Sequence, residues 1–389
     1  MSAACRQEKE CGLTILMKVI VFVEDFGATG VVRNAIAIAA RLSEIGHNVT
    51  LLAAKPDGVL RGSVSAQVVT AWLNEAEEAG SRKAVMRRSF LRFRAYLKKE
   101  KPDIVFSSGN HGHLLVLAGT RLLPCRTMVR ISNDLDHKSN GREAGLWATW
   151  TRNLKFRTIL TLADRVVLVS ARLLEQVTAL DPAFGRKAVV ISNGVDVAAV
   201  RAQAENEVPG AALFEDDAPV TLAIGRLVPQ KNFATLFDAL AIARKSSDVR
   251  LLLIGTGPLK AALLAQAEGL GIGSAIRVID PVPNPFPIMK RSAAMILPSW
   301  WEGSSNVLLE AIACGTPVVA SRTAGNAAEI LGDDEYGLLV DPSSAEELAA
   351  AILTQIGPGP TLPKDRAQAY DRSVAMTAYA QLVDGLAAK

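Results

Sequence analysis

Short runs of β-branched and other apolar residues alternate with longer stretches of helical periodicity along nearly the whole chain. In the first half, these short runs are Val19–Val23, Val49–Leu52, Ile104–Ser107, Thr127–Ile131, Arg165–Val169 and Ala188–Ile191. Helical patterns such as Val31–Ile45 and Ala84–Lys98 separate them. Alternation of strands with helices predicts parallel sheets whose two faces are both covered by helices.

The same pattern starts again after the polar stretch Arg201–Pro219. The later short runs are Thr221–Ile224, Arg250–Ile254, Ala275–Val278, Met295–Leu297, Pro317–Ala320 and Leu338–Val340. A chain of 389 residues is long enough for two ordinary domains. We therefore predict an α/β fold of two Rossmann-like, doubly wound domains that face each other across a cleft. The predicted domains are residues 17–205 and 206–371, and a last helix in residues 372–389 is expected to pack back on the first domain.

Charge and cysteine usage exclude several classes of protein. The chain has 43 lysines and arginines against 39 aspartates and glutamates, and the net charge of +4 is too small to indicate nucleic-acid binding. No run of about 18 uninterrupted apolar residues occurs, so no membrane-spanning segment is predicted. The four cysteines form no CxxC pair, which is typical of free thiols in a reducing cytosol. We therefore expect a cytoplasmic protein.

A buried helix is predicted within SWWEGSSNVLLEAIACGTPVVAS, which runs from Ser299 to Ser321. Asn306–Ala313 has helix-forming composition, and either Ser304 or Ser305 is expected to cap its N-terminus. Gly315 is expected to end the helix. The apolar residues cover nearly its whole circumference, which is typical of a helix inside a core.

Two carboxylates interrupt this apolar segment. Glu310 shares a polar stripe with Asn306, at positions i and i+4. A buried carboxylate without a partner costs on the order of several kcal/mol or becomes protonated, so we expect Glu310 to have a partner in the protein or in a ligand. Glu302 lies just before the helix, where the free backbone N–H groups favour an anion. The alternative is structural: Glu310 pairs with a core arginine and Glu302 is exposed.

The segment IGRLVPQKNF, from Ile224 to Phe233, carries two cations beside a predicted strand end. Arg226 follows the strand immediately, and Lys231 lies on the loop that enters the next helix. Two cations at the carboxyl edge of a parallel sheet can clamp a diphosphate. The alternative is that both are solvated loop residues.

Two turns that contain glycine are weaker indications of a binding site than the segments above. IGTGPLKAALLA, from Ile254 to Ala265, imitates a dinucleotide fingerprint, but Lys260 stands in place of the third glycine, so we interpret it as a tight strand-to-helix turn. DFGATGVVRN, from Asp25 to Asn34, can admit the phosphate or sugar of a ligand close to its backbone, or can be a plain turn.

Histidines and acidic residues gather after two further predicted strands. They lie in GNHGH (His111, His113) and in SNDLDH (Asn133, Asp134, Asp136, His137). Their spacings fit no standard zinc pattern, so we expect polar residues that line a cleft and no metal site.

A strongly basic helix is predicted from Ser81 to Lys101. This stretch holds nine basic residues and one acidic residue, and its apolar residues recur on one face. Such a helix is typical either of an ordinary core-facing helix or of a peripheral contact with an anionic membrane. LWATWTRNLKFR, from Leu146 to Arg157, interleaves aromatic residues with cations in a similar way.

Taken together, these motifs resemble the retaining glycosyltransferases of family 4, which have the GT-B fold. The matching segments are SNGVD (192–196), GRLVPQKN (225–232), NPFPIMKRSAAMILPS (284–299), EGSSNVLLEAIACGTPVVAS (302–321), AGNAAEI (324–330) and YGLLVDP (336–342). The resemblance extends from about Met17 to the C-terminus and is most specific between Ile224 and Pro342.

The resemblance implies roles for residues of the second domain. Arg226 and Lys231 would bind the donor diphosphate and stabilise the charge that develops as the glycosidic bond breaks. Glu302 would contact hydroxyls of the donor sugar, and Glu310 would accept hydrogen bonds from the ribose. The backbone N–H groups that would hold sugar and phosphate are those of Ser305, Asn306, Val307 and Leu308. No metal ion or other cofactor is expected.

The first domain departs from the family pattern at two positions. Thr29-Gly30 stands where two adjacent glycines are usual, so only Gly30 carries over as a donor-binding position. Asn133 stands near a position where the family often has a histidine close to the donor sugar.

The resulting hypothesis is a retaining glycosyltransferase that uses a nucleotide-diphosphate sugar, with a UDP-sugar favoured. Its acceptor would be a glycan or a lipid-linked oligosaccharide in the synthesis of surface polysaccharide, at the inner face of the cell membrane. Three alternatives stay open at this point: a nucleotide-sugar epimerase, an NAD-linked Rossmann oxidoreductase, and a non-catalytic relative that binds sugars or partners.

Overall fold

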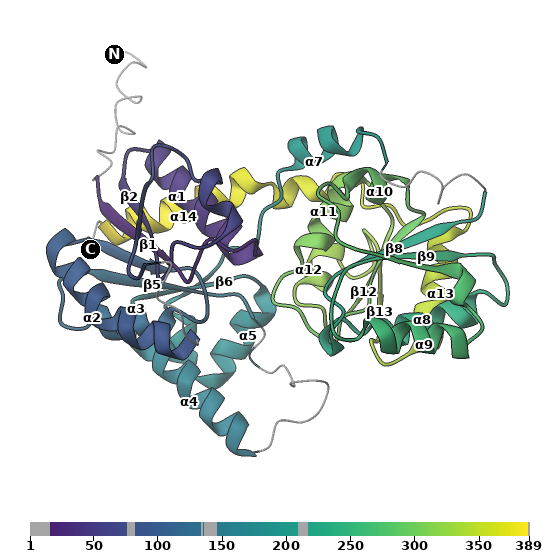
Figure 1. The fold of residues 1–389 in the computed structure, drawn as a ribbon, viewed down its shortest axis with the longest axis horizontal. Helices are drawn as coiled ribbons and strands as arrows, with labels where there is room; N and C mark the ends of the chain where they lie inside the picture. The colour runs from purple at the N-terminus through teal and green to yellow at the C-terminus, as the bar shows by residue number, and fades with distance from the viewer. Residues whose placement is uncertain (1–15, 76–81, 134, 136–145, 209–216, 388–389) are drawn as a thin grey trace, which may run out of the picture. The chain divides into compact units, whose positions relative to one another are not determined.

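The computed structural model describes residues 16–75, 82–133, 135, 146–208 and 217–387, in two compact units (Figure 1). The first unit comprises the chain up to Ile131, Leu162–Val166 and the chain from Met376 onward. The second comprises Ser132–Thr161 and Val167–Ala375. No helix among the described residues is long and apolar enough to cross a membrane.

The first sheet has seven strands in the order β3-β2-β1-β4-β5-β6-β7. Its strands are β1 (Lys18–Val23), β2 (Asn48–Ala53), β3 (Val69–Trp72), β4 (Ile104–Ser107), β5 (Arg126–Ile131), β6 (Arg165–Leu168) and β7 (Ala188–Val190). The interior strand β1 is parallel to both neighbours, with Val19 opposite Val49 on one side and Ile104 on the other. Such a sheet requires crossover connections, which helices provide.

Helices connect these strands. They are α1 (Gly30–Glu44), α2 (Arg82–Glu100), α3 (His113–Thr120), α4 (Leu146–Leu162), α5 (Ala171–Leu180) and α6 (Pro182–Gly185), with a 3₁₀ turn η2 (Val59–Ser63). Two further helices follow the first sheet or end the chain, α7 (Val197–Ala204) and α14 (Arg372–Ala387).

Alternating residues of β4 pack against helices on opposite faces of the first sheet. Val105 belongs to a buried cluster with Phe22 of β1 and Phe93 of α2, whose rings lie 5.5 Å apart. The ring of the next residue, Phe106, lies 5.9 Å from that of Tyr379 on α14. Because successive side chains of a strand point to opposite faces, the sheet is buried on both sides.

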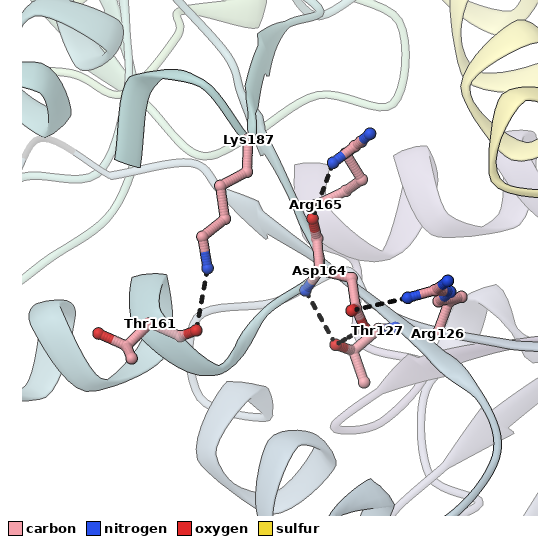
Figure 2. A network of polar contacts seen from close by, with 6 residues as sticks. All are labelled: Arg126, Thr127, Thr161, Asp164, Arg165 and Lys187. Carbon is pink, nitrogen blue, oxygen red and sulfur yellow. Dashed lines mark hydrogen bonds and ion pairs between the residues drawn. The ribbon is translucent and has the colours of Figure 1, made fainter. Parts of the chain in front are cut away.

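A polar network closes the amino edge of this sheet, opposite to the ends where ligands bind in such folds (Figure 2). One carboxylate oxygen of Asp164 accepts hydrogen bonds from the backbone N–H and the hydroxyl of Thr127, both at 2.8 Å. Arg126 lies 3.5 Å from the other carboxylate oxygen. Lys187 donates to the carbonyl of Thr161 at 2.9 Å. This network fastens the end of α4 and the start of β7 to their surroundings, which is a structural role.

The second sheet has six strands in the order β10-β9-β8-β11-β12-β13. They are β8 (Val220–Ile224), β9 (Arg250–Ile254), β10 (Ile276–Ile279), β11 (Ala294–Leu297), β12 (Val318–Ser321) and β13 (Leu338–Val340), all joined in parallel pairs. Its helices are α8 (Phe233–Ala243), α9 (Lys260–Gly269), α10 (Phe286–Arg291), α11 (Asn306–Cys314), α12 (Ala327–Leu331) and α13 (Ala345–Ile356). Short 3₁₀ turns are η5 (Pro229–Lys231), η6 (Gly273–Ala275) and η7 (Arg366–Tyr370).

Two buried apolar clusters lie on the two faces of this second sheet. One joins α8, α9 and α13 to the sheet, and the other joins α7, α10, α11 and α12 to it (Figure 1). The core of each face is built mainly from Leu, Ile, Val and Ala side chains that are almost fully removed from water, with Phe233 and Phe237 on one face and Met289 and Met295 on the other.

The predicted alternation of strands and helices is confirmed, and two Rossmann-like parallel sheets are present. Every strand proposed from the sequence exists, with ends that differ by at most one residue. The strand that the sequence pattern missed is β3, Val69–Trp72, which is short and only partly buried.

Candidate functional site

Three loops leave the carboxyl ends of adjacent strands in the second sheet. Strands β8, β11 and β12 are neighbours, so the loops at residues 225–232, 298–305 and 322–326 emerge from the same edge. The carboxyl edge of a parallel sheet is where such folds bind ligands. All three loops belong to the second compact unit.

Lys231 and Glu302, which the sequence singled out separately, are bonded to each other across two of these loops. The ammonium nitrogen of Lys231 lies 2.5 Å from a carboxylate oxygen of Glu302. Ser299 donates its hydroxyl to the same oxygen at 2.9 Å. The two charged side chains are only 14% and 11% exposed, so the pair is shielded from water and held in a fixed geometry. The alternative of a solvated lysine and an exposed glutamate is therefore wrong.

Arg226 lies on the same loop as Lys231 but points outward. Its side chain is exposed, and no ion pair joins it to any residue within the described ranges. The next residue, Leu227, is fully buried and anchors the loop, since its N–H donates to the carbonyl of Thr256 at 2.8 Å. Arg226 is thus a cation exposed to solvent, on the same loop as Lys231, whose ammonium group is bonded to Glu302.

Asn232 fixes the end of this loop, a role that the sequence analysis did not assign. Its backbone is left-handed, with φ of 54°. Its side-chain amide donates to the carbonyl of Pro342 at 2.7 Å and accepts from the hydroxyl of Thr235 at 2.8 Å. Asparagine tolerates the left-handed conformation better than most residues, and this preference was the available signal.

The turn after β9 supports the loop by backbone packing. A side chain on Gly255 would begin 1.9 Å from the carbonyl oxygen of Gly225, and one on Gly257 would begin 2.5 Å from that of Leu227. The interpretation of IGTG as a tight strand-to-helix turn is confirmed, because α9 starts at Lys260 directly after it. Glycine is required at both positions because two loops pack closely there. This packing explains both glycines without a bound dinucleotide.

Helix α11 begins at Asn306 and ends before Gly315, as predicted, and its last residue is Cys314, one beyond the predicted Ala313. Ser305 is the N-cap, and its hydroxyl oxygen accepts from the backbone N–H of Leu308 at 3.4 Å. Gly315 ends the helix in a left-handed conformation with φ of 79°. Since one hydroxyl satisfies one N–H, the remaining N–H groups of the first turn, including those of Asn306 and Val307, stay available to an anion.

The predicted polar stripe of α11 is already in contact with other groups of the protein. The amide of Asn193 donates to the side-chain oxygen of Asn306 at 2.8 Å. Glu310 is partly buried and takes part in a polar or electrostatic contact of its own. Burial, followed by the nearby charge of Glu310, raises the pKa of the Cys314 thiol to about 12. Both polar residues of the stripe, Asn306 and Glu310, therefore have contacts within the protein. The raised pKa also makes Cys314 an unreactive thiol.

Of the two predicted donor-binding residues in the first half of the chain, Asn133 lies next to the Glu302 loop, since a side chain on Gly303 would begin 3.1 Å from its backbone nitrogen. Gly30 is the first residue of α1, after the N-cap Thr29. Asn133 is exposed and follows β5. Asp134, Asp136 and His137 fall outside the described residues. Within the described part of the chain, no group of three or more His, Cys, Asp or Glu residues is arranged to hold a metal ion.

His113 does not line a cleft, which corrects one expectation. It is 1% exposed, and its two ring nitrogens lie 2.7 Å from the hydroxyl of Ser107 and 3.2 Å from the side-chain oxygen of Asn110. Both nitrogens are bonded inside the protein, where they tie the start of α3 to the end of β4. His111, two residues earlier, is exposed.

Comparison with known proteins finds two matching family models. Glycosyltransferase Family 4 matches residues 28–199, and Glycosyl transferases group 1 matches residues 218–357. An N-acetylgalactosaminyltransferase of Campylobacter jejuni that acts on a diphospho-undecaprenol substrate is 33% identical over 157 residues, which is 39% of this chain and 42% of that protein. The lipopolysaccharide core glycosyltransferase LpsE of Rhizobium meliloti is 36% identical over 136 residues, 35% of this chain and 39% of that protein. The chain thus spans less than half the length of these curated relatives.

Solved structures are similar over nearly the whole chain. Sucrose-phosphate synthase from Thermosynechococcus elongatus has a TM-score of 0.77 at 21% identity and covers 96% of this chain and 99% of its own. HepE of Anabaena, in complex with UDP and glucose, has a TM-score of 0.75 at 18% identity and covers 95% of this chain and 100% of its own. At these identities the likeness establishes the fold.

Proposed function

Because this chain belongs to the glycosyltransferases of family 4 and group 1 and has the GT-B fold, we propose that it transfers a sugar from a nucleotide-diphosphate sugar to a glycan or lipid-linked acceptor. The proposed pathway is the synthesis of a surface polysaccharide or lipid-linked oligosaccharide. The observation that carries the proposal is the shielded Lys231–Glu302 pair beside the N-terminus of α11.

The donor diphosphate is proposed to bind between the two cations of the β8 loop and the N-terminus of α11. Arg226 is exposed and free to approach a phosphate, whereas Lys231 is already oriented by Glu302. Guanidinium, ammonium and free backbone N–H groups all stabilise the negative charge that a departing diphosphate develops. We propose on this basis that the enzyme needs no metal ion or other cofactor.

Glu302 is proposed to contact the donor sugar. One of its oxygens accepts from both Lys231 and Ser299, so the second oxygen can accept from sugar hydroxyls. Glu310 is proposed to receive the ribose hydroxyls of the nucleoside, and Gly30 and Asn133 are proposed as further donor-binding residues.

Transfer is proposed to retain the configuration of the anomeric carbon. The bond between that carbon and the diphosphate oxygen breaks, and the acceptor oxygen bonds to the carbon on the same face. The acceptor's proton passes to the departing phosphate oxygen, so no side chain is required as the base. Lys231 and Arg226 then balance the charge of the leaving group.

UDP-sugars are the proposed donors. HepE was solved with UDP and glucose, and the Campylobacter relative is named for transfer of N-acetylgalactosamine to a diphospho-undecaprenol substrate. LpsE is named for lipopolysaccharide core synthesis. These names support the proposal of a UDP-sugar donor and of a lipid-linked acceptor.

A lipid-linked acceptor fits a basic surface on α2. Its exposed residues are Arg87, Arg88, Leu91, Arg92, Ala95, Lys98 and Lys99. Five cations on one helix face, with Leu91 74% exposed among them, are typical of a peripheral contact with anionic headgroups. We propose that this face holds the enzyme at the membrane where its acceptor lies.

The experiment that tests the function is a donor screen. The purified protein is incubated with a panel of nucleotide sugars and lipid-linked acceptors without divalent metal, and nucleotide release and product are measured. We expect transfer from at least one UDP-sugar with retained configuration. Release of no nucleotide from any donor would refute the proposal, and conversion of the nucleotide sugar without transfer would favour an epimerase.

A further inference from the structure

The loop after β12 lies directly against the loop that carries Glu302. A side chain on Gly325 would begin 2.9 Å from the carbonyl oxygen of Glu302 and 2.8 Å from that of Gly303. Gly325 has a left-handed backbone with φ of 61°, so only a residue without a side chain permits this approach. The Glu302 loop therefore contacts two other loops: Lys231 of the β8 loop bonds to Glu302, and the 322–326 loop, in which Arg322 is the one charged residue, packs its backbone against Glu302 and Gly303.

Buried polar groups without partners gather in these two loops and at the end of β12. The hydroxyls of Ser304, Ser321 and Thr323 are buried and have no hydrogen-bond partner among the described residues. Asn326, which is 2% exposed, has no such partner for either its amide nitrogen or its oxygen. Native proteins satisfy nearly all buried polar groups, so a cluster of this kind needs a ligand or water to complete it.

We propose that Asn326, together with Ser304 and Thr323, forms a specificity pocket that binds a polar substituent of the transferred sugar. This inference rests on the proposed function and adds the feature of the donor that is recognised. A carboxamide offers donors and an acceptor side by side. It therefore matches groups that also donate and accept, which on a sugar are a hydroxyl or an acetamido group.

The chemistry of the pocket differs from that of the diphosphate clamp. Lys231 and Arg226 recognise negative charge, which all nucleotide sugars share. Asn326, Ser304 and Thr323 carry no charge and read hydrogen-bonding geometry, which differs between sugars. A site whose buried groups require hydrogen bonds rejects an analogue that lacks them much more strongly than an apolar pocket rejects a missing methylene.

The absence of a hydrogen-bond partner for Asn326 among the described residues also predicts how its substitution affects the stability of the protein. Removing one member of a satisfied hydrogen-bonded pair is destabilising, whereas removing an unpartnered buried amide relieves its desolvation cost, which offsets the cavity that the smaller side chain leaves. Asn326→Ala should therefore leave the melting temperature of the free protein unchanged or raise it. A purely structural asparagine would lower it.

The test is titration calorimetry with the full chain and its Asn326→Ala and Asn326→Asp variants. The ligands are UDP and four UDP-sugars: UDP-glucose, UDP-galactose, UDP-N-acetylglucosamine and UDP-N-acetylgalactosamine. The four sugars differ only at two ring positions. Asn284→Ala is the matched control, because that amide belongs to the same unit and donates to the carbonyl of Gln203 at 3.0 Å.

We expect the unmodified protein to prefer one of the four sugars by at least tenfold, and Asn326→Ala to reduce this preference at least tenfold while UDP affinity changes less than twofold. Comparison of the acetamido sugars with their hydroxyl counterparts then identifies the substituent. An unchanged preference in Asn326→Ala, or no preference in the unmodified protein, overturns the pocket but leaves the transferase activity measured in the donor screen intact. A lower melting temperature with a uniform loss of affinity assigns Asn326 a structural role and also overturns it.

Discussion

At the scale of single residues, the Lys231–Glu302 pair determines how the candidate site meets an anion. The ammonium group is already bonded to a carboxylate at 2.5 Å, so an incoming diphosphate must share this cation with Glu302. A negative charge so close to the phosphate position weakens phosphate binding while it orients the lysine. Glu302 therefore orients the Lys231 side chain but lowers the affinity for the diphosphate. Substitution of Lys231 should weaken diphosphate binding, whereas substitution of Glu302 should strengthen it.

Lys231→Ala should weaken UDP binding about 10- to 100-fold and reduce turnover by about 100-fold or more, because a charge-assisted contact to the diphosphate is lost. It should also lower the free energy of unfolding by about 1–3 kcal/mol, since Glu302 is left nearly buried without its cation. Glu302→Gln should bind UDP about fivefold more tightly and still lose turnover. Calorimetry and nucleotide release measure both effects.

The control for this pair is Lys290→Ala. Lys290 and Glu205 are also 2.5 Å apart in the same unit, but their side chains are 43% and 68% exposed. An exposed pair contributes about 0–1 kcal/mol, so this variant should resemble the unmodified protein in every assay. Weaker UDP binding in Glu302→Gln would contradict the prediction that the Glu302 carboxylate lowers the affinity for UDP.

At the scale of elements, two glycines support the second sheet for different reasons. Gly315 ends α11 with φ of 79°, and a side chain there would meet nothing within 4 Å. Gly255 has an ordinary φ, but a side chain there would collide with the carbonyl of Gly225. One glycine is required by backbone conformation and the other by close packing between two loops.

We expect Gly315→Ala to lower the free energy of unfolding by about 1 kcal/mol and to leave donor binding unchanged. Gly255→Ala should cost about 2–3 kcal/mol or more and weaken UDP binding, because the loop that carries Arg226 and Lys231 must move. Chemical denaturation and calorimetry distinguish the two. Equal costs with equal UDP binding would show that the loop contact is unimportant.

The basic face of α2 makes a separate prediction about membranes. Replacing Arg87, Lys98 and Lys99 by glutamine removes three exposed cations. At about 1 kcal/mol per cation, the partition onto vesicles that contain anionic lipid should fall about a hundredfold. Co-sedimentation with anionic and with neutral vesicles measures it. Lys245→Gln combined with Arg277→Gln, two exposed cations of the other unit, is the control, and an equal loss there would point to unspecific charge attraction.

The sequence was informative wherever one residue or a periodic pattern determines local structure. Strand alternation, the cap Ser305 and the end at Gly315 were predicted because these signals are local. The partners of Lys231 and the role of Asn232 depend on loops that meet only in the fold. His113 was misjudged for the same reason, since its burial depends on what packs around it.

At the scale of the whole molecule, the last helix completes the first unit. The chain enters that unit again at Met376, within α14. Tyr379 is nearly buried, its ring lies beside Phe106 of β4, and burial, although opposed by Arg130, raises the pKa of its hydroxyl. The aspartate Asp384 lies 3.3 Å from the buried ring of His47.

Tyr379→Ala should lower the free energy of unfolding by about 3–4 kcal/mol, because it leaves a cavity against the sheet. Val374→Ala, on the same helix but at a position that is 55% exposed, should change it by less than about 0.5 kcal/mol. Thermal and denaturant unfolding of both variants provide the comparison. A small effect at Tyr379 would mean that α14 is not part of this core.

The position of α14 also bears on how the protein is made. The ribosome delivers Phe106 before the residues of the second unit and Tyr379 after them, so the ring of Phe106 lacks this contact while that unit is synthesised. Domains that fold as the chain emerges normally need only sequence already synthesised. Here a sheet of the first unit waits for α14, and a nascent chain of this protein should depend on chaperones until α14 has been synthesised.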